Sequence, residues 1–262
     1  MGTIIRSQLY QLKRMKFAFV IYLLFVLVVG LTTIRMSGSE ACVHVEEFML
    51  KNPDFMVSFG MLTVGLWVGY TCGMDFKDKV GNYEVMYGHS RLQVYAGRFI
   101  PGCFVSAISA TILVFVTFLA GGLFVGFEGG VDTVNLCIRC ALTIFPYLRM
   151  AAFLVCLTFM IRNPYIIMSL GYGLFMAYAA TSSLELKLNR SIIGSITNLR
   201  GLADCSGWSI YNLDPAKGIV TYGTFDTGLS AGLVLGTMVS SLVMMGIYFI
   251  IGYLFFTKCD LD

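Results

Sequence analysis

The chain has 262 residues, of which 57% are hydrophobic and 13% are charged, with a formal net charge of +3 and a mean hydropathy of +0.79. Soluble domains carry about 25% charged residues, so this composition excludes an ordinary soluble domain. Apolar runs of about twenty residues recur, and each is long enough to cross a hydrocarbon core about 30 Å thick. No charge block or proline-rich stretch divides the chain. We therefore expect an all-α, polytopic membrane protein in which residues 1–262 form a single transmembrane domain.

Residues 1–16 precede the first apolar run and predict an amphipathic helix at the membrane interface. Ile5, Leu9, Leu12 and Met15 recur at helical spacing, with basic residues elsewhere around the helix. Such a helix places its apolar side in the acyl boundary and its basic side chains toward anionic lipid headgroups. The alternative is that residues 1–16 simply extend the first span.

The apolar runs predict six membrane-spanning segments. These segments must be helical, because lipid cannot satisfy open backbone N–H and C=O groups. The first run is too long for a removable signal peptide and lacks its small-residue cleavage site, so it is expected to stay as an anchor. The predicted spans are residues 17–34, 55–74, 99–125, 136–161, 164–184 and 229–256.

Basic residues set the predicted orientation, because short cytoplasmic loops are enriched in Lys and Arg. The short loops on one side hold Arg35 and Lys51, and the long segment 185–228 counts weakly in this rule. We therefore expect the chain in the cell membrane with both termini in the cytoplasm. The basic residues then placed inside are Arg6, Lys13, Arg14, Lys16, Lys77, Lys79, Arg91, Arg98, Arg162 and Lys258.

Two rows of glycines at four-residue spacing predict close contacts between helices. Such rows let helix backbones approach one another where lipid offers no hydrophobic driving force. The contact lies either within one subunit, which we favour, or between two subunits. The rows are Gly65, Gly69 and Gly73 in the second span and Gly228, Gly232 and Gly236 at the start of the sixth.

Arg149 lies near the middle of the predicted span 136–161, after Pro146. A charged side chain inside a membrane is costly and normally faces the bundle interior or a wet cavity. There it could meet a substrate carboxylate, which makes Arg149 a candidate residue of a translocation path, or it could steady the neighbouring helix through backbone carbonyls. Alternatively, Pro146 divides the segment and places Arg149 nearer the membrane surface.

Residues 185–228 are predicted as the long outer segment, and connections longer than about 15 residues usually carry structure or function of their own. Leu188, Ile192, Ile196 and Leu199 form a stripe at helical spacing. The residues that follow indicate turns, with Trp208, Tyr211 and Tyr222 suited to the headgroup level. We expect one or two short helices on the outer leaflet, acting as an outer lid.

Cys42 and Cys205 are both predicted in polar segments on the outer side, so a disulfide between them is one possibility. Spacing alone does not fix cysteine pairing. Cys137 and Cys140 form a lone CxxC within an apolar run. We favour core packing for this pair over a metal or redox site, because buried cysteine usually behaves as a small hydrophobe.

The sequence lacks the common motifs of catalysis. It contains no GxxxxGK[ST] phosphate loop, and neither GxSxG nor HExxH occurs. His44 and His89 fall in loops predicted on opposite sides of the membrane, so they cannot share a metal ion. We therefore expect that the chain is not an enzyme, binds no metal or cofactor of its own, and has no nucleic-acid partner.

Residues 75–98 interrupt the apolar runs with a polar, tyrosine-bearing segment, the largest predicted cytoplasmic loop. We expect a short helix, a break at Gly88, and a second helix that enters the membrane. Val80, Tyr83 and Tyr87 lie at positions i, i+3 and i+7, so one face of the first helix could dock on a partner. The residues expected to stay in water are Lys77, Lys79 and Glu84.

The stretch MDFKDKVGNYEVMYGHSRLQVYAGRFI, residues 74–100, resembles the cytoplasmic loop of type-2 ABC-transporter permeases. In that family an acidic residue precedes a Gly-Thr-like start, a short coupling helix, a Ser-Arg pair, and a Gly-Lys pair that enters the next span. The interfacial helix, the six spans and the long segment before the last span are similar as well. The matching residues are Asp75 or Asp78, Gly81-Asn82-Tyr83-Glu84, Ser90-Arg91 and Gly97-Arg98.

The resemblance implies the membrane subunit of a bacterial ABC exporter. Separate ATP-binding subunits would supply hydrolysis of ATP with Mg²⁺, and two permease chains, identical or related, would form the pathway. The substrate class implied is amphipathic, either a peptide, as in antimicrobial-peptide export or immunity, or a lipid-like molecule. The alternative function is a membrane binding or sensor protein that uses residues 185–228. The residues implied in coupling to the ATPase are Val80, Gly81, Tyr83, Glu84, Tyr87, Ser90 and Arg91.

Overall fold

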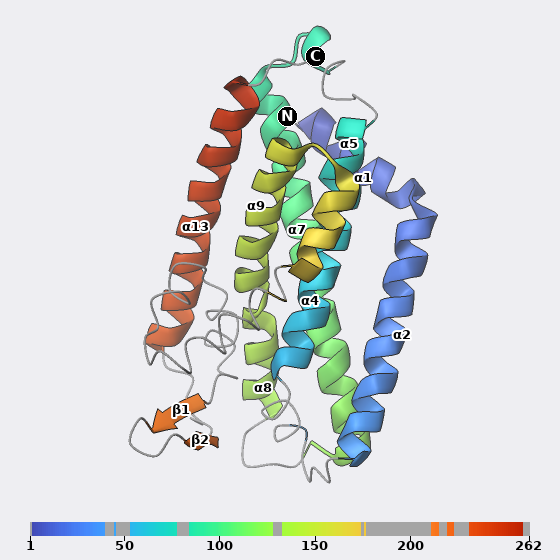
Figure 1. Cartoon of the computed structure of the whole chain (residues 1–262), viewed down its shortest axis with the longest axis vertical. Coiled ribbons are helices and arrows are strands. Elements are labelled where there is room, and N and C mark those ends of the chain that lie inside the picture. The colour runs from blue at the N-terminus through green and yellow to red at the C-terminus, as the bar shows by residue number, and fades with distance from the viewer. Residues whose placement is uncertain are drawn as a thin grey trace.

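The computed structural model describes residues 2–39, 45, 53–77, 84–127, 133–173, 176, 211–214, 219–222 and 231–258. Helices dominate these residues, and the long ones run side by side along one axis (Figure 1). Residues 164–173 are also helical. The named helices are α1 (Gly2–Arg14), α2 (Lys16–Ser39), α4 (Pro53–Val68), the π-helical turn η1 (Gly69–Gly73), α5 (Met74–Lys77), α7 (Arg91–Val125), α8 (Thr133–Leu142), α9 (Ile144–Ile161) and α13 (Ala231–Lys258).

Four helical stretches within the described residues are long and apolar enough to cross a membrane, namely Lys16–Met36, Arg91–Val125, Thr133–Ile161 and Val234–Lys258. They coincide with the first, third, fourth and sixth predicted spans. The second predicted span lies in α4 and η1. The fifth, 164–184, is helical over 164–173, and most of its remainder lies outside the described residues. The molecule therefore has the architecture of a helical membrane protein.

The outward faces of α2 and α13 are apolar. These two helices stand at opposite sides of the bundle (Figure 1). Leu23 and Leu27 of α2 and Leu235 and Val239 of α13 are exposed. Contiguous apolar surface of this kind calls for a covering partner, and hydrocarbon of a bilayer is the one that these helix lengths fit.

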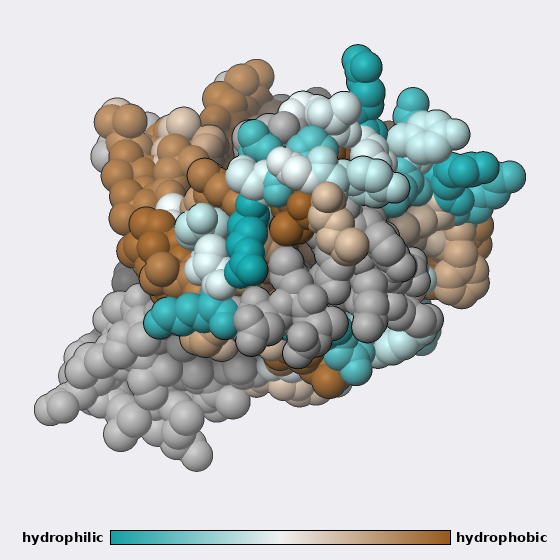
Figure 2. Space-filling view, turned by 90° about the horizontal axis from the view of Figure 1, so that it is seen from above, coloured by the Kyte–Doolittle hydropathy of each residue, from teal (hydrophilic) through white to brown (hydrophobic). Residues whose placement is uncertain are grey.

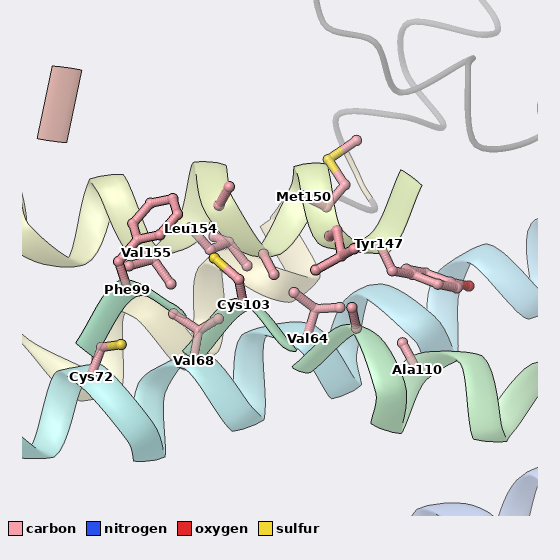
Figure 3. Packing of buried hydrophobic residues seen from close by; sticks show 14 of the residues in the cluster. Val64, Val68, Cys72, Phe99, Cys103, Ala110, Tyr147, Met150, Leu154 and Val155 are labelled. Atoms are coloured by element: carbon pink, nitrogen blue, oxygen red, sulfur yellow. The ribbon is translucent and has the colours of Figure 1, made fainter. Parts of the chain in front are cut away.

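The core forms around α7, which contacts α1, α2, α4 and α9, while α13 packs mainly on α9. Figure 3 shows the centre of this core, where large and small side chains from α4, η1, α7 and α9 pack together. Small residues such as Cys103 and Ala110 let α7 approach its neighbours closely. The labelled residues come from α4 and η1 (Val64, Val68, Cys72), α7 (Phe99, Cys103, Ala110) and α9 (Tyr147, Met150, Leu154, Val155).

The predicted span 136–161 is divided into α8 and α9 at Thr143. Pro146 has no N–H group, and its ring excludes a helical carbonyl four residues earlier, at Leu142. At the break itself, the Cys140 carbonyl accepts from both the N–H and the Oγ1 of Thr143, over 3.3 Å and 2.6 Å. The division predicted from Pro146 is therefore present, yet Arg149, which follows it, is only 2% exposed.

Residues 211–214 and 219–222 differ from the sequence-based expectation of turns and short helices. Strand β1 (Tyr211–Asp214) pairs antiparallel with β2 (Ile219–Tyr222), with Tyr211 opposite Tyr222. The aromatic and β-branched residues of these strands favour sheet over helix. The expectation is wrong for these strands, while the predicted stripe at 188–199 and Trp208 lie outside the described residues.

Candidate functional site

Hydrophilic side chains gather at the end of the bundle that carries α1 and α5, here termed the α1 end. Figure 2 looks directly onto it and shows hydrophilic residues across the surface, with hydrophobic residues along one side. The first residue of α7 meets the last turn of α13 there, because Arg91 Nη1 donates to the Thr257 carbonyl over 2.8 Å. This end holds the described part of the polar segment 75–98.

A group of three charged side chains and one amide, termed the Arg98 cluster, lies at the α1 end and consists of Asp75, Glu84, Arg98 and Gln8. Arg98 Nε donates to Asp75 Oδ2 over 2.7 Å, and Arg98 Nη2 lies 2.9 Å from Glu84 Oε2. Gln8 Nε2, from α1, donates to the same Asp75 oxygen. Gln8, Asp75 and Arg98 are 4%, 6% and 2% exposed. The cluster therefore joins α1, α5, α7 and the segment before α7.

Local sequence features fix where Arg98 lies. Ser90 caps α7, with its Oγ accepting from the Gln93 N–H and Gln93 Oε1 accepting from the Ser90 N–H, both over 3.3 Å. This capping box starts the helix at Arg91. Arg98 is then two turns inside, where a lone buried charge would be costly. Asp75, in the short helix directly after η1, supplies the opposite charge.

Glu84 carries the second carboxylate of the cluster. Burial raises the pKa of Glu84 above its usual 4.5, and the positive charge of Arg98 opposes this rise. The negative charge of Asp75 raises the Glu84 pKa further, and His89 lowers it. Two carboxylates thus compete for one guanidinium, and Glu84, being the more exposed of the two, is the weaker partner.

A short segment, residues 84–87, projects from the cluster and is termed the Tyr87 turn. The N–H of Gly88 donates to the Val85 carbonyl over 3.0 Å, and that of His89 donates to the Glu84 carbonyl over 3.2 Å. Gly88 has φ of 90°, a left-handed conformation that glycine adopts without strain, so the predicted break is here. Tyr87 at the tip is 86% exposed, and Met86 beside it is 82% exposed.

The predicted coupling residues divide into two groups. Glu84 and Tyr87 belong to the Tyr87 turn, whereas Ser90 and Arg91 hold the start of α7 through the cap and the bond to Thr257. The structure thus gives these last two a positioning role. Val80, Gly81 and Tyr83 lie outside the described residues.

The face of α1 that packs on the bundle was not predicted from the sequence. Ile4, Gln8 and Leu12 face the bundle, while Leu9 is 46% exposed. Hydrophobic spacing alone selected the stripe of Ile5, Leu9, Leu12 and Met15. Asp75 is a buried acceptor, and the amide of Gln8 on this face satisfies it. Of the predicted membrane-facing stripe, Leu12 packs in the bundle instead, while Leu9 is exposed as such a stripe requires.

The first glycine row packs within the chain. A Cβ on Gly65 would lie 2.9 Å from Gly171 Cα, and one on Gly73 would lie 2.8 Å from Pro164 Cα. Gly69 meets Met168 in the same way. The row therefore lets α4 and η1 approach residues 164–171. In the second row, Gly236 faces open space. Gly228 lies outside the described residues, and for Gly232 the structure describes only the helical backbone.

Arg149 lies near the start of α9, whereas it is the other end of this helix that lies toward the α1 end (Figure 1), so Arg149 is apart from the Arg98 cluster. It is close enough to Tyr248 of α13 for an electrostatic interaction. The Tyr248 ring centroid lies 5.3 Å from that of Phe153. Arg149 is therefore buried where α9 meets α13.

Tyr95 of α7 forms an aromatic centre that the sequence analysis missed. Its ring centroid lies 4.5 Å from Phe159 of α9 and 5.0 Å from Phe249 of α13. A Cβ on Gly252 of α13 would lie 2.3 Å from the Tyr95 hydroxyl. Tyr95 thus joins three helices near the α1 end. The spacing of Tyr95 and Phe99 along α7 is the sequence signal for such a contact.

Cysteines and metal-ligating residues form no further site in the part of the chain that the structure describes. Cys72, Cys103, Cys137, Cys140 and Cys156 are free thiols. No three His, Cys, Asp or Glu side chains among the described residues come together as metal ligands would. Cys42 and Cys205 lie outside those residues.

The sequence was compared with protein-family models and with curated proteins. No protein-family model matches the chain. No curated protein is significantly similar to it in sequence. The function is therefore argued from the residues and their geometry.

Proposed function

We infer that the chain is the transmembrane subunit of an ATP-driven ABC exporter, moved at its α1 end by separate ATP-binding subunits. In this proposal six spans cross the cell membrane with both termini in the cytoplasm. A second permease chain completes the pathway, and ATP and Mg²⁺ bind the partner subunits. The substrate is an amphipathic peptide or a lipid-like molecule. The proposal rests first on the resemblance of residues 74–100 to a permease coupling loop.

The observation that carries the proposal is the Tyr87 turn and its anchorage. Met86 and Tyr87 are almost fully exposed, although large apolar side chains in water are costly. Aromatic residues and methionine are enriched in the cores of protein interfaces. We assign this pair as the contact for the ATP-binding subunit.

The base of the turn is attached to the bundle at several points. Val85 packs against the core, Glu84 pairs with Arg98, and Arg91 holds the end of α13. Force applied at Tyr87 would therefore be transmitted to α7 and α13 through these contacts. A coupling element requires such attachment, because a loop without contacts to the bundle would move without displacing the helices.

Copurification tests the proposal. The full chain is isolated from its native membranes, and the eluate is assayed for a partner that contains a phosphate-binding loop and hydrolyses MgATP. Tyr87→Glu combined with Met86→Glu should abolish binding of this partner, because a charge buried at an interface without a counter-charge is costly. Tyr165→Glu, at another exposed tyrosine of the same end, is the matched control and should retain binding. Partner binding that survives the double substitution would refute the assignment.

A further inference from the structure

Helix α1 is held at the level where a spanning helix leaves the membrane. It ends at Arg14, and α2, which is long and apolar enough to cross a bilayer, begins at Lys16. Met15 alone separates them, and its N–H still donates to the Leu12 carbonyl over 3.1 Å. So short a connection cannot carry α1 away from the headgroup layer.

The outward face of α1 is basic. Arg6, Tyr10, Lys13 and Arg14 are all exposed, and their spacing of i, i+4, i+7 and i+8 places them on one face. The Arg14 guanidinium carbon lies 5.7 Å from the centre of the Tyr10 ring. A stripe of this charge at this level complements anionic phospholipid headgroups, whose attraction grows with the number of Lys and Arg residues near the surface.

The opposite face of α1 touches the coupling region. Ile4 packs where Gly97 leaves room, since a Cβ on Gly97 would lie 2.7 Å from Ile4 Cγ2. Gln8 Nε2 donates to Asp75 Oδ2, the oxygen that also holds Arg98. Arg98 in turn pairs with Glu84, the first residue of the Tyr87 turn. One chain of polar contacts thus runs from α1 to the tip.

We propose that α1 senses anionic lipid and passes its position to the Tyr87 turn through Gln8, Asp75, Arg98 and Glu84. Headgroups that hold the basic face would fix α1 against the bundle and keep Gln8 on Asp75. Arg98 would then stay oriented toward Glu84, and the turn would stay ordered. The inference deepens the proposed function, on which it rests for the role of the turn, by naming anionic phospholipid as its regulator.

Hydrogen exchange of the purified full chain tests the proposal without any partner subunit. The amides of Gly88 and His89, whose bonds close the turn, are compared in vesicles of phosphatidylcholine alone and in vesicles that also contain phosphatidylglycerol. We expect severalfold slower exchange in the anionic vesicles, because exchange reports local opening. Equal exchange in the two vesicles would overturn the proposal.

Two variants test the route of the signal. Gln8→Met keeps an unbranched side chain of similar length but loses the bond to Asp75, so the lipid effect should disappear. Gln11→Met, at a half-buried glutamine of the same helix outside the Arg98 cluster, is its matched control and should keep the effect. A lipid effect that persists in Gln8→Met would overturn the relay.

The lipid-binding face is tested separately, with exposed residues whose replacement leaves the core intact. Arg6→Gln, Lys13→Gln and Arg14→Gln together should remove the lipid effect, whereas Arg162→Gln with Lys258→Gln, off α1, should leave it. Inorganic phosphate added to neutral vesicles should not slow exchange; slowing would point to a soluble anion and overturn the assignment to lipid. These exchange measurements use the chain alone. Failure to find an ATP-binding partner would therefore refute the proposed function without affecting the result for the lipid effect.

Discussion

Arg98 and Asp75 lie 23 residues apart in the sequence, and their side chains form a buried ion pair with Nε and Oδ2 2.7 Å apart. The pair holds the start of α7 against the end of the α4–η1–α5 segment. Breaking a buried pair by removing one partner costs about 3–5 kcal/mol, because the remaining charge is left in a poor solvent. The pair therefore stabilises the packing of helices at the α1 end, unlike an exposed ion pair on the surface.

Asp75→Asn should destabilise the chain strongly, by about 3–5 kcal/mol. The amide still accepts from Gln8 but no longer neutralises Arg98. Arg98→Met together with Asp75→Leu should recover part of the loss, since a buried pair can be replaced by apolar residues of similar volume. Thermal unfolding of the purified chain in detergent measures both. Equal loss in the single and the double variant would contradict an ion-pair origin.

Glu84 should make stability depend on pH. Its pKa is raised above 4.5 in the folded chain, so the folded state holds this proton more tightly than the unfolded state. The resulting stabilisation is fully present below about pH 4.5 and is lost as pH rises through the folded-state pKa. Glu84→Gln cannot titrate and should therefore gain stability relative to the parent chain as pH rises from acid to neutral. A difference between the two proteins that is constant with pH would exclude this role for Glu84.

The long apolar helices could be predicted from the sequence, while their breaks depended on local chemistry. Runs of hydrophobic residues located four of the six predicted spans closely, because length and composition alone decide which helices suit a bilayer. Pro146 indicated a division of the fourth span but not its position at Thr143. The pairing of β1 with β2 was missed because the polar and glycine-containing residues around these strands indicated turns.

The candidate site was predicted in its location but not in its contacts. The polar segment 75–98 indicated the break at Gly88, but Glu84, expected in water, instead lies against Arg98 with its side chain 18% exposed. Gln8 carried no such signal: it lies in an amphipathic helix where a glutamine is usually exposed. Its partner, Asp75, is 67 residues away, and only the three-dimensional packing shows that the two meet.

Gly65 should tolerate no side chain. Gly65→Ala would place a Cβ 2.9 Å from Gly171 Cα, a backbone atom that cannot turn aside, so we expect a loss of about 1–3 kcal/mol. Gly236→Ala is the matched control: nothing lies within 4 Å of its Cβ position, and exchanging a helical Gly for Ala gains up to about 1 kcal/mol. Thermal unfolding of the two variants in detergent separates them. Similar stability of both would show that the first glycine row is not a packing contact within the chain.

Tyr95 and Gly252 should show strong coupling. Gly252→Ala would place a Cβ 2.3 Å from the Tyr95 hydroxyl, and Tyr95 cannot rotate away because aromatic rings of α9 and α13 surround it, so we expect a loss of about 1–3 kcal/mol. Among the described residues nothing accepts a hydrogen bond from this buried hydroxyl, and Tyr95→Phe should therefore cost little or stabilise the chain.

In the double variant, Tyr95→Phe with Gly252→Ala, the clashing oxygen is gone, and most of the stability lost in Gly252→Ala should be recovered. A double-mutant cycle measured by thermal unfolding tests this, and simple additivity of the two changes would show that α13 does not pack on Tyr95 through Gly252.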